Sequence, residues 1–335
     1  MNRLTLCIIV ALLILTTAQP ALAIEIPGDG SGEGTYYDIV NGEYVLKQDV
    51  SEAITITSDE IILDGATHTV TGSGSGFGIK LVGKTGVTIK NLTVQNFSSG
   101  IYLASYSNGN NLTDNTISGN ARGIHLHTSC EGNTLKDNTI SGNSWGINLY
   151  ASCNENVIRG NTIEYNLVYG IILEVNSNQN EIYNNNFISN PTQTFIVNST
   201  GNVFNLDIPI GGNYWSDYNG EDTDSDGIGD TLVPYLDLDN YPWVIQDGWS
   251  PEALIKKLIF KVEELNLQNG INNNLDAKLQ NALDALEAKN AGQRQDAINK
   301  MQAFVNAVEA QSGDKIPVEA ADELIAIANY IISLL

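Results

Sequence analysis

The sequence predicts a mainly β protein. We expect a right-handed single-stranded parallel β-helix of about six to seven rungs, followed by a small all-α bundle of four helices. A Gly-Ile-x-Leu phrase recurs at intervals of 22, 23, 23 and 24 residues, beginning at Gly78, Gly100, Gly123, Gly146 and Gly170. Two asparagine phrases, Asn-x-Leu/Ile/Phe and Asn-x-Ile/Phe-x-x-Asn, recur with it, and after Trp249 the composition shifts from Gly and Asn to Ala, Leu, Lys and Glu.

Each period therefore holds three short strands separated by Asn, Gly and Ser turns. Strand alternation directs Ile and Leu inward and the intervening residue outward. One repeat cannot bury a core, so the rungs must stack, each strand pairing with its counterpart in the next rung at ~4.8 Å. The turn asparagines tolerate left-handed backbone, and their stacked amides can hydrogen-bond along the rod. No stretch before residue 250 has a helical period, which excludes a helical solenoid.

The two ends of the chain differ from the repeats. Residues 1–23 contain Arg3, a 12-residue apolar run and an Ala-Leu-Ala cleavage signal. This pattern is typical of a secretory signal peptide and is too short for a transmembrane span. We expect an N-terminal cap at 24–53, repeats at 54–205, a C-terminal cap at 206–249 and the helical bundle at 250–335. The mature protein is expected to be secreted, extracellular or on the cell surface.

The C-terminal bundle is predicted from capping residues and from apolar spacing. Ser250-Pro251 is an N-cap followed by a first-turn proline, and Gly270 is expected to end the first helical segment. Gly313 and Pro317 are expected to separate the third helix from the fourth. Apolar residues at helical spacing mark the four helices: Leu254, Leu258, Val262 and Leu265; Leu275, Leu279, Leu283 and Leu286; Ala297, Met301, Phe304, Val305 and Val308; Ala321, Leu324, Ile325, Ala328 and Ile331.

The charge balance excludes strongly anionic partners. The chain has 16 Lys and Arg against 39 Asp and Glu, a net charge of −23. Such a chain repels nucleic acids and anionic lipids.

Two segments of the β region carry a family resemblance. Ile61-Ile62-Leu63-Asp64-Gly65 with His68 is similar to the first rung of NosD-like proteins. The closing segments Gly211–Tyr218 and Asp222–Asp230 resemble the same family, and the likeness spans roughly residues 35–245. It implies β-helix repeats of the carbohydrate-binding and sugar-hydrolase type. It also implies copper delivery in a periplasm for the name-giving members, whereas most relatives are surface proteins.

The helical segment resembles the FIMAH module found at the C-terminus of secreted prokaryotic proteins. The resemblance implies an interaction or attachment role, and a purely stabilising appendage is the alternative. Asp322 and Glu323 are interpreted as solvated helix charges.

The strongest local motif is Asp222-x-Asp224-x-Asp226-Gly227-x-x-Asp230. Carboxylates at positions 1, 3, 5 and 9 with Gly at 6 are typical of an EF-hand-type calcium loop, in which Ile228 would offer its carbonyl. Position 12 is Val233, so the missing ligand would come from Asp217, Glu221, Asp237 or Asp239. We expect structural calcium here, and a solvated acidic loop is the alternative.

A candidate ligand face lies on the outward side of the Gly-Ile-x-Leu strands. Tyr102, His125 and Asn148 form one predicted stripe, and His127 and Tyr150 belong to the neighbouring one. These side chains suit a sugar, by stacking and hydrogen bonding, and two histidines also suit a divalent metal. An ordinary exposed sheet face remains the third interpretation.

Cys130 and Cys153 are one rung apart, seven residues after the repeat glycine in each case. A spacing of ~4.8 Å between stacked residues is compatible with a disulfide, and a ladder of small residues with free thiols is the alternative. No methionine cluster accompanies them, so we do not expect copper.

Catalysis has weaker candidates. Asp114 and Asp137 occupy equivalent turns one rung apart, next to Lys136 and Arg159. Paired carboxylates suit a retaining glycosidase, and acids beside a cation suit a polysaccharide lyase. Each Asp, however, precedes a repeat Asn, where turn chemistry favours it. The sequence therefore favours a non-catalytic secreted or surface protein that binds a glycan or serves as an envelope scaffold, with a glycan or another cell-envelope component as its partner. A carbohydrate-active enzyme and a copper accessory protein are the alternatives.

Overall fold

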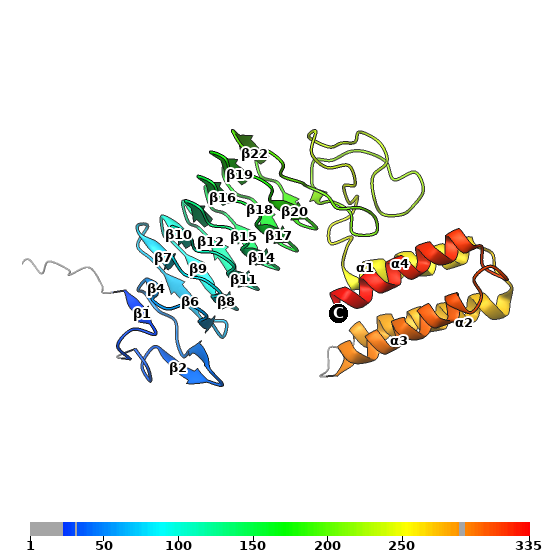
Figure 1. Ribbon diagram of the computed structural model, residues 1–335, viewed down its shortest axis with the longest axis horizontal. Helices are drawn as coiled ribbons and strands as arrows, with labels where there is room; N and C mark the ends of the chain where they lie inside the picture. The colour runs from blue at the N-terminus through cyan, green and yellow to red at the C-terminus, as the bar shows by residue number, and fades with distance from the viewer. Residues whose placement is uncertain (1–22, 31, 288–291) are drawn as a thin grey trace, which may run out of the picture.

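The structure is a computed structural model that describes residues 23–30, 32–287 and 292–335. The predicted signal peptide, apart from Ala23, lies outside the described residues. The chain forms a parallel β-solenoid of about seven turns followed by four helices, which confirms the predicted fold class (Figure 1). None of the helices described is long and apolar enough to cross a membrane.

Three sheets run along the rod, and each rung contributes one strand to each of them. The first sheet contains β1 (Ile24–Ile26), β4 (Ile54–Ile56), β7 (Phe77–Val82), β10 (Ser99–Ala104), β13 (Arg122–His127), β16 (Trp145–Tyr150), β19 (Tyr169–Glu174) and β22 (Thr192–Val197). The second contains β2 (Tyr37–Val40), β3 (Glu43–Leu46), β5 (Ile62–Asp64), β8 (Thr88–Lys90), β11 (Asn111–Thr113), β14 (Thr134–Lys136), β17 (Val157–Arg159) and β20 (Glu181–Tyr183). The third contains β6 (Thr69–Thr71), β9 (Thr93–Gln95), β12 (Thr116–Ser118), β15 (Thr139–Ser141), β18 (Thr162–Glu164), β21 (Asn186–Ile188) and β23 (Tyr214–Trp215).

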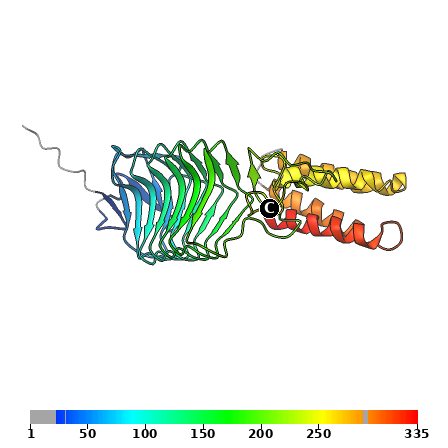
Figure 2. The same cartoon turned by 90° about the horizontal axis from the view of Figure 1, so that it is seen from above.

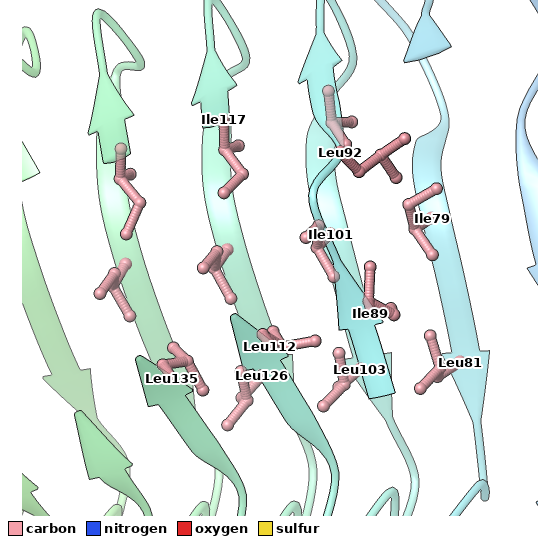
Figure 3. Close-up of a cluster of buried hydrophobic side chains, with 14 of the residues drawn as sticks. Ile79, Leu81, Ile89, Leu92, Ile101, Leu103, Leu112, Ile117, Leu126 and Leu135 are labelled. Carbon is pink, nitrogen blue, oxygen red and sulfur yellow. The ribbon is translucent and has the colours of Figure 1, made fainter. Parts of the chain in front are cut away.

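The interior is built from stacked aliphatic side chains in register between rungs. In the first sheet Ile101 pairs with Ile124 and Leu103 with Leu126, and all four are fully buried. Figure 3 shows Ile and Leu side chains from successive rungs pointing into the same core. The repeat glycine is required here, because a Cβ on Gly146 would lie 2.4 Å from the Gly170 carbonyl oxygen of the next rung.

Three ladders of asparagine side chains run along the inner corners of the rod, as the stacked turn residues predicted. In each ladder the Nδ2 of one Asn donates to the Oδ1 of the next at 2.8–3.1 Å. That Oδ1 also accepts the preceding Asn's backbone N–H, as between Asn115 and Asn138 at 3.1 Å. The ladders are Asn110-Asn133-Asn156-Asn180-Asn202, Asn115-Asn138-Asn161-Asn185-Asn213 and Asn120-Asn143-Asn166-Asn190. Buried turn amides are thereby satisfied without water.

Both ends of the rod are closed by irregular structure. At the start, β1 pairs with β4 in parallel, and β2 and β3 form an antiparallel hairpin. At the end, Trp215 stacks on Phe187 with ring centroids 4.4 Å apart. The Asp239 carboxylate receives N–H groups from Asn213 (2.8 Å), Trp215 Nε1 (2.8 Å) and Tyr241 (3.0 Å). Asp239 therefore joins the second asparagine ladder to the end cap and is unavailable as the twelfth-position calcium ligand.

Four helices follow: α1 (Pro251–Glu264), α2 (Asn269–Glu287), α3 (Gln293–Glu309) and α4 (Val318–Leu334). The Ser250 hydroxyl caps α1 by accepting the Ala253 N–H at 3.2 Å. Gly270 was expected to end a helical segment but lies in the first turn of α2. In α4 the predicted residues Ala321, Leu324, Ala328 and Ile331 are buried. Ile327 is also buried, whereas Ile325 lies at the edge of the core-facing stripe and is only partly buried.

The helical bundle is packed onto the end of the β-helix. Ile228, Trp243 and Trp249 of the end cap belong to the same buried cluster as the bundle core. A hydrogen bond of 2.7 Å joins Asn184 Nδ2 to the Tyr330 hydroxyl of α4. Figure 2 shows the bundle at the opposite end of the rod from the first strands.

Candidate functional site

The five predicted ligand-face residues lie together on the outer side of the first sheet. Tyr102 pairs with His125 and His125 with Asn148, while His127 of β13 pairs with Tyr150 of β16. The two stripes are adjacent, because the residues of each stripe alternate with inward-facing leucines.

Ring contacts join these residues into a continuous chain across β7 to β16. Tyr102 stacks on Phe77 at 4.1 Å between centroids with an interplanar angle of 16°. Tyr102 also contacts His125 at 5.2 Å, and His127 stacks on Tyr150 at 5.3 Å. Because the rings pack on one another, the faces of Tyr102 and Tyr150 are partly covered. The surface therefore presents ring edges and tyrosine hydroxyls as well as ring faces.

A second outward row on this sheet, made of three aromatic residues and Arg122, was not predicted from the sequence. Phe77, Arg122, Trp145 and Tyr169 are in register at the start of their strands. The Arg122 guanidinium lies 4.6 Å from the Trp145 ring centroid, and Tyr169 is 6.0 Å from Trp145. Tyr169 in turn stacks on Phe195 at 5.1 Å. The signal was present in the sequence, since each residue before a repeat glycine, here Phe77, Trp145 and Tyr169, also faces outward.

We call this surface the aromatic face. It consists of the half-buried or exposed rings Phe77, Tyr102, His127, Trp145, Tyr150, Tyr169 and Phe195. Tyr150 and Phe195 are 37% and 39% exposed.

Two predicted members of the face are buried, contrary to expectation. His125 is 8% exposed and Asn148 is 2% exposed. Both are short relative to the neighbouring rings, which close over them at the ~4.8 Å rung spacing. Burial, helped by the positive charge of Arg122, lowers the pKa of His125 to about 3, and its Nδ1 has no hydrogen-bond partner among the residues that the structure describes. His125 is therefore a neutral imidazole beneath the face, and Asn148 Nδ2 is bound to Glu174 at 3.2 Å.

The predicted calcium loop brings three carboxylates together. Oxygen atoms of Asp222, Asp224 and Asp226 lie within 4.8 Å of one another. Asp222 also orders the loop, accepting the N–H groups of Asp226 at 3.0 Å and Gly227 at 2.8 Å. Burial and the neighbouring Asp226 carboxylate raise the pKa of Asp224.

The other two predicted calcium ligands, Asp230 and Ile228, are engaged in other contacts. The Asp230 carboxylate accepts from the N–H and the hydroxyl of Thr223, at 2.7 and 2.6 Å, and is outside the three-carboxylate group. The Ile228 side chain is buried against the bundle, and its N–H donates to Asp226 at 2.7 Å. Lys257 of α1 places its ammonium 3.3 Å from Asp226, a neighbour from a distant segment that the motif did not reveal.

The weak catalytic candidates occupy turn conformations. Asp114 and Asp137 have φ angles of 56° and 55°, in the left-handed region that Asp tolerates. Asp114 accepts the Thr113 hydroxyl at 2.9 Å, and Asp137 pairs with Lys136 at 3.1 Å. These contacts agree with a turn role. A cavity beside the bundle is also lined by Lys136, Asp137 and Arg159.

Cys130 and Cys153 are fully buried, free thiols on adjacent rungs. The Cys153 thiol lies 3.3 Å from the Tyr150 carbonyl oxygen, and the neighbouring Cys130 thiol together with burial raises the pKa of Cys153.

These positions test whether the chain offers a copper donor set. Both thiols are enclosed in the core, and Met301 is buried in the bundle. Within the described ranges, the group of side chains that lie close enough to hold a metal ion consists of Asp222, Asp224 and Asp226. These three offer only oxygen ligands. Copper favours thiolate, thioether and imidazole ligands. The ring centroids of His125 and His127 are 5.5 Å apart, but no third such ligand is grouped with them among the described residues, so the donor set does not fit copper.

The fold and its surface define a class: a parallel β-helix protein with asparagine-laddered corners, an aromatic outer face and a docked helical domain. The family model described as "Periplasmic copper-binding protein (NosD)" matches residues 22–220, and the FIMAH domain model matches residues 256–333. The chain belongs to the NosD family and carries a C-terminal FIMAH domain.

Comparison with solved structures returns periplasmic alginate epimerase AlgG. One crystal structure is 21% identical, covers 45% of this chain and 37% of that chain, and superposes with a TM-score of 0.41. A point-substituted form is also 21% identical, covers 47% of this chain and 39% of that chain, and has a TM-score of 0.37. The chain thus spans less than two fifths of the length of these structures. No curated protein matches the chain.

Proposed function

We propose that this protein is a non-catalytic glycan-binding protein of the cell envelope or extracellular space, and that the aromatic face is its binding surface. The observation that carries the proposal is that outward aromatic rings occur on all six first-sheet strands from β7 to β22. Their ring contacts form two groups, Phe77 to Tyr150 and Trp145 to Phe195, which share β16. Five steps between strands give a length of ~24 Å, enough for several sugar units. Contiguous exposed apolar surface of this kind is typical of binding sites.

The chemistry of the face suits sugars. Ring edges and faces can cover the C–H groups of a pyranose, while the Tyr102, Tyr150 and Tyr169 hydroxyls and the Trp145 N–H can bond its hydroxyls. Arg122 lies against Trp145 and adds a cation at the centre of the face.

A catalytic role has less support on the same surface. On the six first-sheet strands β7, β10, β13, β16, β19 and β22, the carboxylate at an outward position is that of Glu174. It is already bonded to Asn148. Hydrolysis or elimination requires several converging ionisable groups. One engaged carboxylate beside a neutral His125 does not supply them.

Location is proposed on two grounds. The first 23 residues have the pattern of a secretory signal peptide, and the family description is of a periplasmic protein. An attachment or interaction role for the helical bundle is compatible with that location.

The binding proposal is tested by aromatic substitutions on and off the face. Tyr150→Ala and Trp145→Ala remove rings from the face, whereas Tyr165→Ala removes a more exposed tyrosine elsewhere, 60% exposed. The mature protein and each variant are screened on an array of neutral and acidic polysaccharides, with affinities then measured by calorimetry. Losing an aromatic contact of about 0.5–1.5 kcal/mol should weaken binding up to about tenfold in the face variants.

Binding of no polysaccharide, or equal weakening by Tyr165→Ala, would contradict the proposal. Parallel assays for reducing ends and unsaturated products address the enzymatic alternative. Turnover that is lost with Tyr150→Ala would replace the binding function with a catalytic one.

We also propose that Asp222, Asp224 and Asp226 hold a structural calcium ion in the end cap. Three carboxylates whose oxygens lie within 4.8 Å repel one another, and a hard divalent cation relieves that repulsion. Such an ion would stabilise the segment on which the bundle packs.

A further inference from the structure

A cavity of about 290 Å³ lies where the bundle meets the second sheet. One wall is formed by Lys136, Asp137 and Arg159 of the β-helix, and the opposite wall by Arg294 of α3 and Ser333 near the end of α4. The linker that leads into α1 contributes Asp247. The cavity is thus shared by two domains whose relative position is held by buried contacts, including Asn184 with Tyr330 at 2.7 Å.

Three cations face this cavity in a chain of strongly negative charge. The whole sequence has 16 Lys and Arg against 39 Asp and Glu, so three basic residues around one small cavity are a concentration of positive charge. Lys136 and Arg159 are direct neighbours on adjacent strands. Like charges opposite one another destabilise a sheet, so the arrangement calls for a compensating anion.

The two carboxylates in the cavity supply only part of that compensation, because three cations line it. Asp137 is paired with Lys136 at 3.1 Å, and Asp247 accepts the Asn186 Nδ2 at 2.6 Å. Among the described residues, Arg159 and Arg294 have no ion pair and no hydrogen bond through their side chains. Two arginine forks therefore face the cavity uncommitted, and the planar guanidinium is suited to bidentate recognition of an oxyanion.

We propose that this cavity binds the carboxylate or sulfate group of an acidic saccharide, held between Arg159 and Arg294 with Lys136 at the rim. A volume of about 290 Å³ matches a single sugar ring rather than a polymer segment. The hydroxyl of Ser333 and the amide of Asn184 also line the cavity but are already engaged, with Tyr330 in both cases. The arginines therefore provide the selectivity, and a neutral sugar has no partner there.

This site is separate from the aromatic face, which lies on a different sheet, and the two proposals fail independently. Substitutions at Arg159 and Arg294 leave Tyr150 and Trp145 untouched. Loss of binding to the aromatic face would leave binding in the cavity intact.

The test uses the full mature chain and four probes measured by calorimetry at low salt: glucuronate, a sulfated hexose, glucose and inorganic sulfate. We expect glucuronate or the sulfated hexose to bind, glucose not to bind, and added salt to weaken the affinity. Arg159→Gln and Arg294→Gln should each weaken binding about tenfold or more, because each removes a charged hydrogen bond. Lys256→Gln, an exposed charge on α1 outside the cavity, should leave the affinity unchanged.

Four outcomes would overturn the proposal. Three of them concern the probes: no binding of either acidic sugar, equal binding of glucose, and inorganic sulfate binding as tightly as the acidic sugars. An unchanged affinity in Arg159→Gln with Arg294→Gln would also overturn it. Among the described residues neither arginine side chain has an ion pair or a hydrogen bond, and Arg159→Gln removes a like charge opposite Lys136. Neither variant should therefore melt at a lower temperature than the parent. Arg159→Lys, which keeps the charge but loses the fork, should bind with intermediate affinity.

Discussion

The Lys257 ammonium lies 3.3 Å from Asp226 Oδ2, and the two side chains are only 8% and 11% exposed. Burial lowers the pKa of Lys257, and the facing carboxylate opposes that shift. Lys257 also lies 5.8 Å from the Trp243 ring centroid. This one pair links the first helix of the bundle to the acidic loop of the end cap.

Breaking the pair on one side should be costly. Asp226→Asn leaves a buried ammonium without its counter-charge, and we expect a loss of about 3–5 kcal/mol in the free energy of unfolding. Lys257→Met in the same background removes the orphaned charge and should recover much of that loss. Chemical denaturation of the two single variants and the double variant gives the coupling. Additive effects would show that the two residues do not interact.

Calcium should stabilise the end cap. A ligand that binds only the folded state adds about 2.7 kcal/mol at a concentration of one hundred times its dissociation constant. Melting temperatures measured in calcium and in excess chelator should therefore differ. Asp224→Asn should abolish the difference, because it removes an exposed member of the three-carboxylate group without touching Lys257. The exposed Asp207→Asn in the same cap serves as the control. A melt insensitive to chelator would rule out the ion.

Asn138, an internal member of the second asparagine ladder, should contribute strongly to the stability of the β-helix. Asn138 Nδ2 donates to the Leu112 carbonyl at 2.8 Å and to Asn161 at 2.9 Å, and its Oδ1 accepts the Asn115 N–H at 3.1 Å. Asn138→Ala leaves those buried partners unsatisfied, at an expected cost of ~3 kcal/mol or more. Thr116→Ala, at an exposed position on β12, should cost less than about 0.5 kcal/mol. Equal urea midpoints for the two variants would contradict the role of the ladder.

Burial of His125 should make stability depend on pH. Its pKa is about 3 in the folded state against 6.5 for the unperturbed side chain, so the unfolded chain binds the proton more tightly. The contribution of His125 to stability is full above pH 6.5 and declines as the pH falls from 6.5 toward 3. The slope is at most about 1.4 kcal/mol per pH unit. His125→Asn, which copies Asn148 of the next rung, should remove this part of the dependence. Identical pH profiles of unfolding free energy would refute the burial of a neutral imidazole.

The two internal thiols should be protected. Cys130 and Cys153 are both 0% exposed and free. A thiol reagent should label neither in native protein and both after denaturation without reductant. Labelling of neither in denaturant would show a disulfide between the rungs.

The sequence alone determined the β-helix and the register of its rungs. Ile101 and Ile124, or Asn115 and Asn138, recur one period apart, and in a parallel stack each residue pairs with its equivalent in the next rung. Local periodicity therefore specifies long-range pairing, so the core, the asparagine ladders and the two outward stripes that contain Tyr102 and Tyr150 were predictable. The bundle was predictable for a similar reason, because apolar spacing marks the buried face of each helix.

Only the tertiary structure decided what the periodicity does not encode. Whether an outward residue is exposed depends on the size of its neighbours on adjacent strands, so His125 and Asn148 are buried while Tyr150 is 37% exposed. The order of Asp222 to Asp230 did not reveal that Asp230 turns to Thr223 or that Lys257 reaches Asp226. The cavity between Arg159 and Arg294 likewise exists only because the bundle docks on the second sheet. Such contacts join segments with no shared repeat, and their geometry follows from packing between domains.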